Sequence, residues 1–207
     1  MNRLHDLEKN VVLERNAASP ARVYSNDRIQ HIRIMHARNA VKKILLAFKS
    51  EYVSTAHTMR TVVELGCNTA DISGMISMGH KVKVWEVSPK CIEYIARTYP
   101  WIEIHAEDIE TATPIDSDLI ILCEILEHLS DPNEVVRKWL PKAKYALISS
   151  PLRGDLEVDL SGGEHCWSFD PEDFDNFVKI GGHQIMDQTS FAMGQYVIKM
   201  MATKRKE

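Results

Sequence analysis

Cysteine is scarce in this sequence, and no two cysteines have the spacing that a metal site or a redox pair requires. The 207-residue chain has four, Cys67, Cys91, Cys123 and Cys166, and none forms a Cys-x-x-Cys pair. This scatter argues against a zinc knuckle and against a disulfide framework. We therefore expect four reduced thiols.

Long apolar runs are also missing. The longest, at 44–48 and 119–123, are far shorter than the roughly 20 residues that a membrane-spanning helix needs. The first 16 residues are too polar for a secretory signal peptide. We therefore expect a cytoplasmic protein without a membrane partner.

The chain has no large excess of charge of either sign. Its 25 basic and 29 acidic residues give a formal net charge of -4, which argues against a dedicated binder of polyanions. The sequence has neither an internal repeat nor a low-complexity linker. A hydrophobic content of 44% over this length is enough for one sizeable core with an appendage.

Apolar runs typical of strands alternate with helical periodicity from Thr61 onward. The expected strands are 61–65, 81–85, 101–105, 118–123 and 144–149, followed by a terminal hairpin of 183–189 and 195–203 joined by 190–194. Helices are expected from Pro89 to Pro100, from Pro132 to Pro141 and over 172–180. This order predicts an α/β, Rossmann-like, doubly wound fold whose seven-stranded sheet is mostly parallel and ends in an antiparallel hairpin.

The segment before Thr61 has a different pattern. Apolar residues recur at helical spacing over 27–48, and Arg33, Arg38, Lys42 and Lys43 lie among them. Such a basic amphipathic helix either covers the sheet with a solvated cationic face or meets an anionic substrate. We expect residues 1–60 to form a helical cover or lid and residues 61–207 to form the main domain.

A glycine and an acid follow the first two expected strands. Gly66 is placed to turn the chain close to a ligand, and Glu86 lies twenty residues later, where a carboxylate can bind the ribose hydroxyls of a nucleoside. Asn68 and Ala70 stand where a dinucleotide loop has glycines, which disfavours a pyrophosphate. S-adenosylmethionine has the nucleoside without the phosphates.

Four stretches in this order resemble the successive motifs of class I S-adenosylmethionine-dependent methyltransferases. They are ELGCNTADIS, WEVSPKCIEYIARTYP, AEDIE and CEILEHLSDP. The resemblance implies S-adenosylmethionine as cofactor, with the methionine part near 64–70, the ribose at Glu86 and the adenine between Asp108 and Ile109. The cofactor-binding residues that it implies are Glu64, Gly66, Cys67, Asn68, Ala70, Glu86, Val87, Asp108, Ile109, Cys123 and Glu124.

The run CEILEHL places Glu124, Glu127 and His128 just beyond the fourth expected strand, and His165 follows in EHCWSF. This run is similar to that of small-RNA 3′-end 2′-O-methyltransferases and ubiquinone-pathway O-methyltransferases, in which it binds a divalent cation. The resemblance implies that these four residues bind Mg, Mn, Co, Fe or Zn. The same run also occurs in methyltransferases not known to need metal, and Glu127 or His128 is then a pocket residue or a general base.

These observations predict a methyltransferase, with Glu127, His128 and His165 as catalytic residues and a small-molecule hydroxyl as the acceptor. RNA 3′ ends, other nucleic acids and proteins are alternative acceptors. A non-catalytic subunit that binds S-adenosylmethionine and stabilises a partner is the alternative from a different class. The sequence does not identify the acceptor, and it does not indicate an oligomeric state.

Overall fold

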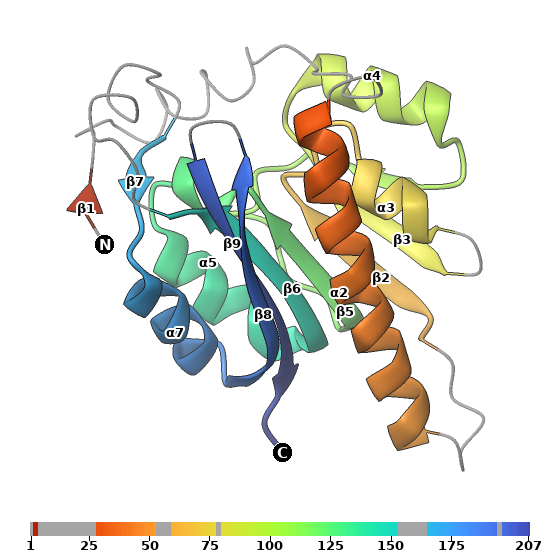
Figure 1. Cartoon of the computed structure of the whole chain (residues 1–207). Helices are drawn as coiled ribbons and strands as arrows, with labels where there is room; N and C mark the ends of the chain where they lie inside the picture. Colours follow the sequence, from red (N-terminus) through yellow and green to blue (C-terminus); the bar gives the residue numbers. More distant parts are fainter. Residues whose placement is uncertain (1, 4–27, 53–58, 78–79, 153–164, 194–195) are drawn as a thin grey trace.

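The computed structural model describes residues 2–3, 28–52, 59–77, 80–152, 165–193 and 196–207 (Figure 1). Its centre is a seven-stranded sheet. The strands are β2 (Thr61–Leu65), β3 (Lys81–Trp85), β4 (Glu103–His105), β5 (Ser117–Cys123), β6 (Ala143–Pro151), β8 (His183–Met193) and β9 (Tyr196–Arg205). Their order is β4-β3-β2-β5-β6-β9-β8.

Strand directions agree with the sequence prediction. The pairs β4/β3, β3/β2, β2/β5 and β5/β6 are parallel, whereas β9 runs antiparallel to both β6 and β8. The predicted Rossmann-like, doubly wound sheet with a C-terminal antiparallel hairpin is thus confirmed.

The helices occupy the connections between strands. They are α2 (Arg28–Tyr52), α3 (Asp71–Ile76), α4 (Pro89–Thr98), α5 (Pro132–Trp139) and α7 (Pro171–Ile180), with the short 3-10 turns η1 (Leu126–His128) and η2 (Leu140–Lys142). A proline at the first position of α4, α5 and α7 costs no helical hydrogen bond, because that N–H has no partner within the helix. Separately, β1 (Asn2–Arg3) pairs with β7 (Trp167–Ser168).

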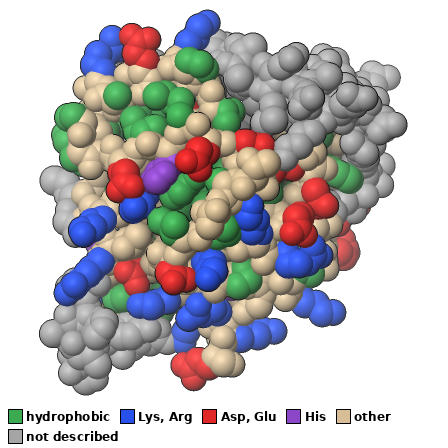
Figure 2. All heavy atoms as spheres, turned by 180° about the vertical axis from the view of Figure 1, so that it is seen from behind, with side chains coloured by type: hydrophobic (Ala, Val, Ile, Leu, Met, Phe, Trp, Pro, Cys, Tyr) green, Lys and Arg blue, Asp and Glu red, His purple; other side chains and the backbone are tan. Residues whose placement is uncertain are grey.

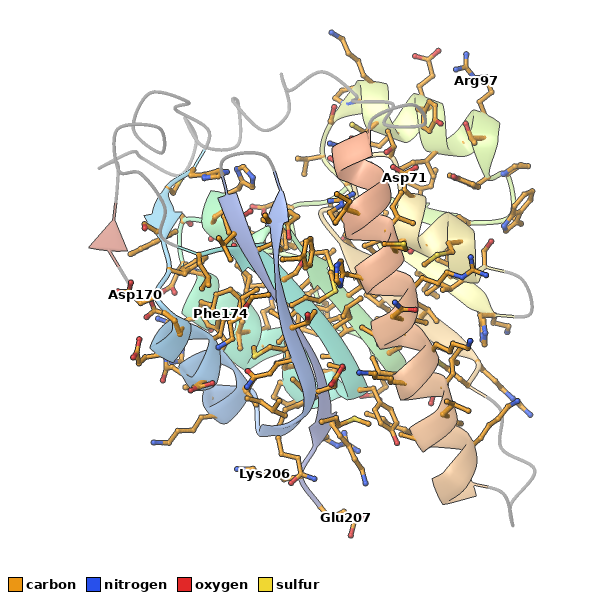
Figure 3. All side chains as sticks on the ribbon, in the orientation of Figure 1. Asp71, Arg97, Asp170, Phe174, Lys206 and Glu207 are labelled. Atoms are coloured by element: carbon orange, nitrogen blue, oxygen red, sulfur yellow. The ribbon has the colours of Figure 1, made fainter. Side chains whose placement is uncertain are left out.

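Alternate side chains of the central strands face two different helical layers. On β5, Leu119 and Ile121 belong to the core under α2, α3 and α4, whereas Ile120 and Leu122 belong to the core under α5 and α7. Figure 3 shows Phe174 pointing from α7 toward the sheet, where its side chain is fully buried. Both faces of the parallel strands are therefore covered, as their near-continuous apolar sequences require.

The helix α2 has one buried face and one exposed basic face. Ala37, Val41, Ile44 and Phe48 are buried on it, whereas Arg38, Lys42 and Lys43 are exposed. On the exposed side, Lys42 and Lys43 line a cavity of about 300 Å³ beside β8. The helix α2 thus packs on the core of the sheet. The assignment of 1–60 as a cover or lid and the division at residue 60 stay predictions, since 4–27 and 53–58 lie outside the described residues.

Some elements differ from the sequence prediction. The third strand starts at Glu103 rather than at Trp101, and β8 continues to Met193 through the expected hairpin connection. Pairing with β9 over that whole length sets the end of β8, with one register shift between Ile185 and Asp187. The helix α3 was not predicted.

Acidic and basic side chains are intermixed on the face seen from behind in Figure 2, with apolar areas between them. This distribution agrees with the small net charge of -4. Among the described helices, none combines the length and the apolar character that crossing a bilayer requires.

The carboxylate of Asp118 holds the amino ends of three strands together. Its Oδ2 accepts the backbone N–H groups of Arg60 and Thr61 at 2.8 and 3.1 Å, and its Oδ1 accepts Lys144 Nζ at 2.8 Å. Burial opposes ionisation, but these bonds outweigh it and lower the pKa of Asp118. The starts of β2 and β6 are thus tied to β5.

We expect Asp118→Ala to lower the free energy of unfolding by about 1–2 kcal/mol, because three donors lose their acceptor. Urea unfolding at pH 7 measures this. Asp116→Ala is the matched control, since the Asp116 side chain is 88% exposed and lies 3.6 Å from Lys142. The difference in unfolding free energy between the two variants should shrink as the pH falls through the lowered pKa of Asp118. Equal stability of the two variants at pH 7 would contradict the stabilising role of Asp118.

Candidate functional site

The loop after β2 has the backbone of a glycine-rich loop with only one glycine. Gly66, Asn68 and Ala70 all have left-handed conformations, with φ of 62°, 50° and 54°. Non-glycine residues adopt this conformation at a cost of about 1–2 kcal/mol each, somewhat less for asparagine. Asn68 and Ala70 therefore adopt the left-handed backbone that glycine takes without strain, although neither is glycine.

Glu86 fixes this loop to the end of β3. Its Oε2 accepts the N–H of Asn68 at 2.7 Å, and its Oε1 accepts the N–H groups of Val87 and Ser88, both at 2.9 Å. Burial raises the pKa of Glu86, and these three hydrogen bonds oppose that rise. The predicted ribose acceptor thus lies beside the predicted methionine loop and also has a structural role there.

The short helix α3 has no capping side chain at its own N-cap residue, and the carboxylate of Glu64 caps it instead. The residue at its N-cap is Ala70, whose side chain cannot accept a hydrogen bond, and Glu64 Oε2 instead accepts the N–H of Ser73 at 3.0 Å. Glu64 is buried, and burial raises its pKa to about 7. Burial therefore shifts this carboxyl group at the end of β2 toward its protonated form.

The carboxyl end of β5 lies directly against this loop. A Cβ atom at Gly66 would come within 2.3 Å of Ile125 Cδ1, so only glycine fits there without a shift. Glu124, just before Ile125, has a φ of 56°, and its Oε1 accepts Ser149 Oγ at 2.6 Å. Cys123 is buried, and burial raises the pKa of its thiol.

Three of the four residues predicted to bind metal converge. Ligand atoms of Glu127, His128 and His165 lie within 4.8 Å of one another. The two imidazole rings are 5.0 Å apart and nearly perpendicular. Glu124 is not in this group of the described residues.

Hydrogen bonds hold the segment of His165 against η1. Cys166 N–H donates to Glu127 O at 2.7 Å, and Trp167 Nε1 donates to Leu129 O at 2.8 Å. Burial and the neighbouring His128 lower the pKa of His165 to about 3. This histidine is therefore neutral at physiological pH, the state that metal ligation requires.

The predicted adenine residues follow β4. Asp108 Oδ1 accepts the N–H of Glu110 at 3.0 Å, and Ile109 is buried. Ile109 O accepts the indole N–H of Trp139 at 3.0 Å, which ties this turn to α5. Asp108 and Ile109 thus belong to an ordered turn at the carboxyl edge of the sheet, beyond β4.

Sequence reasoning did not identify two serines that contact the candidate site. It also assigned one arginine to an exposed surface, whereas the structure half-buries it. Ser149 and Ser150, at the end of β6, bond the carboxylates of Glu124 and Glu127, each at 2.6 Å. The letters ISSP at the end of an expected strand were the available signal. Arg33 was grouped with Arg38 on a basic face, but it is half-buried and its charge acts on Glu64.

Comparisons with known proteins establish the fold. No protein-family model matches the sequence, and no curated protein matches it significantly. Among solved structures, magnesium protoporphyrin IX methyltransferase ChlM from Synechocystis PCC 6803 with bound SAM has a TM-score of 0.69 at 14% identity, covering 100% of both chains. N-methyltransferase NodS from Bradyrhizobium japonicum WM9 with S-adenosyl-L-homocysteine has 0.67 at 15%, covering 94% of this chain and 97% of NodS.

The same architecture also occurs in a protein that is named for a reaction other than methyl transfer. The cyclase SpnF has a TM-score of 0.66 at 11% identity, covering 95% of this chain and 92% of SpnF. At these sequence identities the structural similarities establish the architecture, and the chemistry depends on the residues of the site. The chain thus has the fold shared by these methyltransferases and this cyclase.

Proposed function

We propose that this protein is an S-adenosylmethionine-dependent methyltransferase that methylates a hydroxyl oxygen of a small molecule. The observation that carries the proposal is the left-handed loop of Gly66, Asn68 and Ala70 bonded to Glu86 at the carboxyl ends of β2 and β3. Ligands of open α/β sheets bind at this edge. The bound SAM of ChlM and the S-adenosyl-L-homocysteine of NodS support the choice of cofactor.

The loop favours a nucleoside without phosphate groups over a dinucleotide. In this proposal the methionine part lies along 64–70, Glu86 binds the ribose, and Asp108 and Ile109 flank the adenine. Oε2 of Glu86 accepts the N–H of Asn68, and because a carboxylate oxygen can accept two hydrogen bonds, it can also accept a ribose hydroxyl. The short α3 lacks the glycine-lined start that cradles a pyrophosphate.

The transfer itself requires little from the protein. The bond from the sulfonium to its methyl group breaks as the acceptor oxygen forms its bond to that methyl, and the hydroxyl proton leaves. Holding the oxygen in line with the methyl at about 3–3.5 Å supplies most of the acceleration. In the absence of a bound cation, the proton goes to one of two neighbouring groups, Glu127 or His128, whose nearest carboxylate and imidazole atoms are 4.0 Å apart.

The proposal includes a divalent cation held by Glu127, His128 and His165. A carboxylate oxygen and two imidazole nitrogens are ligands for manganese, magnesium, cobalt, iron or zinc. The low pKa of His165 and the support of Glu127 by Ser150 agree with this use. When bound, such a cation lowers the pKa of a nearby hydroxyl.

Turnover separates a methyltransferase from a subunit that only binds the cofactor. Incubation with S-adenosylmethionine and fractionated metabolites, RNA or protein should give S-adenosylhomocysteine and an acceptor heavier by one CH₂ group. Mass spectrometry detects both products. Transfer to RNA or protein would replace the small-molecule acceptor, and binding without any transfer would support the partner-subunit alternative.

We expect Glu86→Ala to weaken the binding of S-adenosylmethionine and S-adenosylhomocysteine by at least about 1.5–3 kcal/mol, because a charged acceptor is lost and the loop loses a bond at Asn68. Calorimetry measures both affinities. Glu93→Ala is the control, since Glu93 is an exposed acid on α4. Unchanged affinity in a folded Glu86→Ala protein would refute the ribose assignment.

We expect the protein, stripped with chelator and then dialysed against manganese or cobalt, to retain one metal ion per chain. Glu127→Gln and His165→Ala should each lose at least about tenfold in metal affinity, because each removes one ligand. Elemental analysis and the rise of Tm with added metal measure this without any acceptor. His36→Gln, on α2, is the control.

Glu124→Gln is informative in the same assay. Because Ser149 holds the Glu124 carboxylate, we expect this variant to keep most of the metal affinity. A loss equal to that of Glu127→Gln would make Glu124 the fourth ligand. Absence of bound metal in the unmodified protein would contradict the metal proposal and leave Glu127 and His128 as a base and a pocket residue.

A further inference from the structure

The strand β8 forms one edge of the central sheet. It pairs with β9 along one side, and none of the described strands pairs with its other side. Beyond the register shift between Ile185 and Asp187, its pairing with β9 is regular as far as Met193. The outer side of this stretch, about 20 Å long, therefore presents backbone N–H and C=O groups that no described strand binds.

A cavity of about 300 Å³ lies between this strand and α2, which packs alongside the hairpin of β8 and β9 (Figure 1). Two contacts join the helix to the strand there. Lys43 Nζ pairs with Asp187 at 2.5 Å, and the rings of His36 and Phe191 stack with their centroids 4.1 Å apart. His36 and Lys43 lie two helical turns apart, about 10 Å, which is the length of three residues of an extended peptide.

The helix side of this cavity combines hydrogen-bond donors with one apolar side chain. Lys42 and Asn39 line the cavity and are exposed, and neither has a hydrogen bond or an ion pair within the described part of the chain. Leu46 also lines it and is 62% exposed. The carboxylate of Asp187 is already paired with Lys43. The cavity therefore favours a ligand with an anionic group and an apolar group.

The strand edge and the cavity together match an extended acidic peptide. A peptide that adds to a sheet edge forms main-chain hydrogen bonds with it, and its alternate side chains point to the same face of the sheet. Side chains on the α2 face would lie over the cavity, where Lys42 attracts a carboxylate and Leu46 contacts an apolar group. A small organic anion would use the cavity but leave the strand edge unpaired.

A second copy of this chain fits the same edge less well. Symmetric pairing of two β8 strands is antiparallel, with the two-fold axis perpendicular to the sheet, so both α2 helices would lie on one face. The sides of the two helices that carry Lys42 and Lys43 would then face each other. Like charges brought together in this way oppose association. The charge of α2 therefore favours an acidic partner over a second copy.

We propose that the edge of β8 from Asp187 to Met193, together with the adjoining cavity, is the docking site for an acidic segment of a partner protein. The segment adds to the sheet as an extra strand, and one of its carboxylates pairs with Lys42. Three strands, β9, β6 and β5, separate β8 from β2, after which the loop of Gly66 follows. The inference is thus independent of the proposed function, because it assumes neither the cofactor nor the acceptor.

A fluorescein-labelled hexapeptide of alternating glutamate and valine tests the site by fluorescence anisotropy with the full chain. We expect saturable binding, and none with a hexapeptide of alternating lysine and valine. Lys42→Glu should weaken binding about three- to tenfold, because repulsion replaces attraction. Lys49→Glu is the matched control, since Lys49 is exposed on the same helix but does not line the cavity, and its affinity should be unchanged.

Two results of these titrations would overturn the proposal. One is the absence of saturable binding of the acidic peptide, and the other is equal weakening by Lys42→Glu and Lys49→Glu. Should Lys42→Glu fail to fold by circular dichroism, Lys42→Gln removes the charge alone and should weaken binding about two- to threefold. Unchanged affinity in Lys42→Gln would then overturn the proposal.

A modified peptide tests the main-chain pairing. An analogue that is methylated at every backbone nitrogen has the same side chains without the N–H donors. Strand addition predicts that this analogue binds at least about tenfold more weakly than the unmethylated peptide. Equal affinity of the two peptides would show that charge alone attracts them, and strand addition would be wrong.

The other possible occupants have their own signatures. A labelled single-stranded RNA hexanucleotide should bind more weakly than the acidic peptide; tighter binding that Lys42→Glu abolishes would assign the surface to nucleic acid instead. Sedimentation should show a monomer. A dimer that the acidic peptide dissociates would assign the edge of β8 to a second copy and overturn the proposal.

Discussion

The hydrogen bonds that backbone N–H groups donate to Glu86 and Glu64 are the constraint on which this site depends. A loop with three left-handed residues, two of them not glycine, needs compensating contacts to persist. The carboxylate of Glu86 accepts the N–H of Asn68 within that loop, and Glu64 accepts the N–H of Ser73 just beyond it. Glu86 thus stabilises a loop conformation that glycines allow in other proteins, and Glu64 caps α3 as a side chain at the N-cap would.

The fold was largely predictable because its central strands carry strong local signals. The bounds of β2 and β3 agree with the sequence prediction, since runs of valine end there at turn residues. The helix α3 escaped prediction because it has six residues and its cap comes from Glu64, a residue of the preceding strand. The end of β8 was misplaced because long-range pairing with β9 fixes it, and no local residue marks it.

Sequence reasoning named candidate site residues but did not reveal the contacts among them. Sequence spacing grouped Glu124 with Glu127, yet the left-handed backbone at Glu124 sends its carboxylate to Ser149. His165 reaches His128 because Cys166 and Trp167 bond the backbone of 127–129, which a linear pattern does not reveal. Arg33 was assigned with Arg38 to a basic face because both belong to one basic helix, and the sequence does not specify how far each side chain is buried.

The contact between Gly66 and Ile125 links the left-handed loop of 66–70 to η1, which carries Glu127 and His128. Because a Cβ at position 66 would overlap the Ile125 side chain, the two positions share one small volume. A homologue with alanine at position 66 would therefore need a smaller residue at position 125, and the two sites should vary together during evolution. Any redesign of the sequence in this part of the fold would have to treat positions 66 and 125 as one unit.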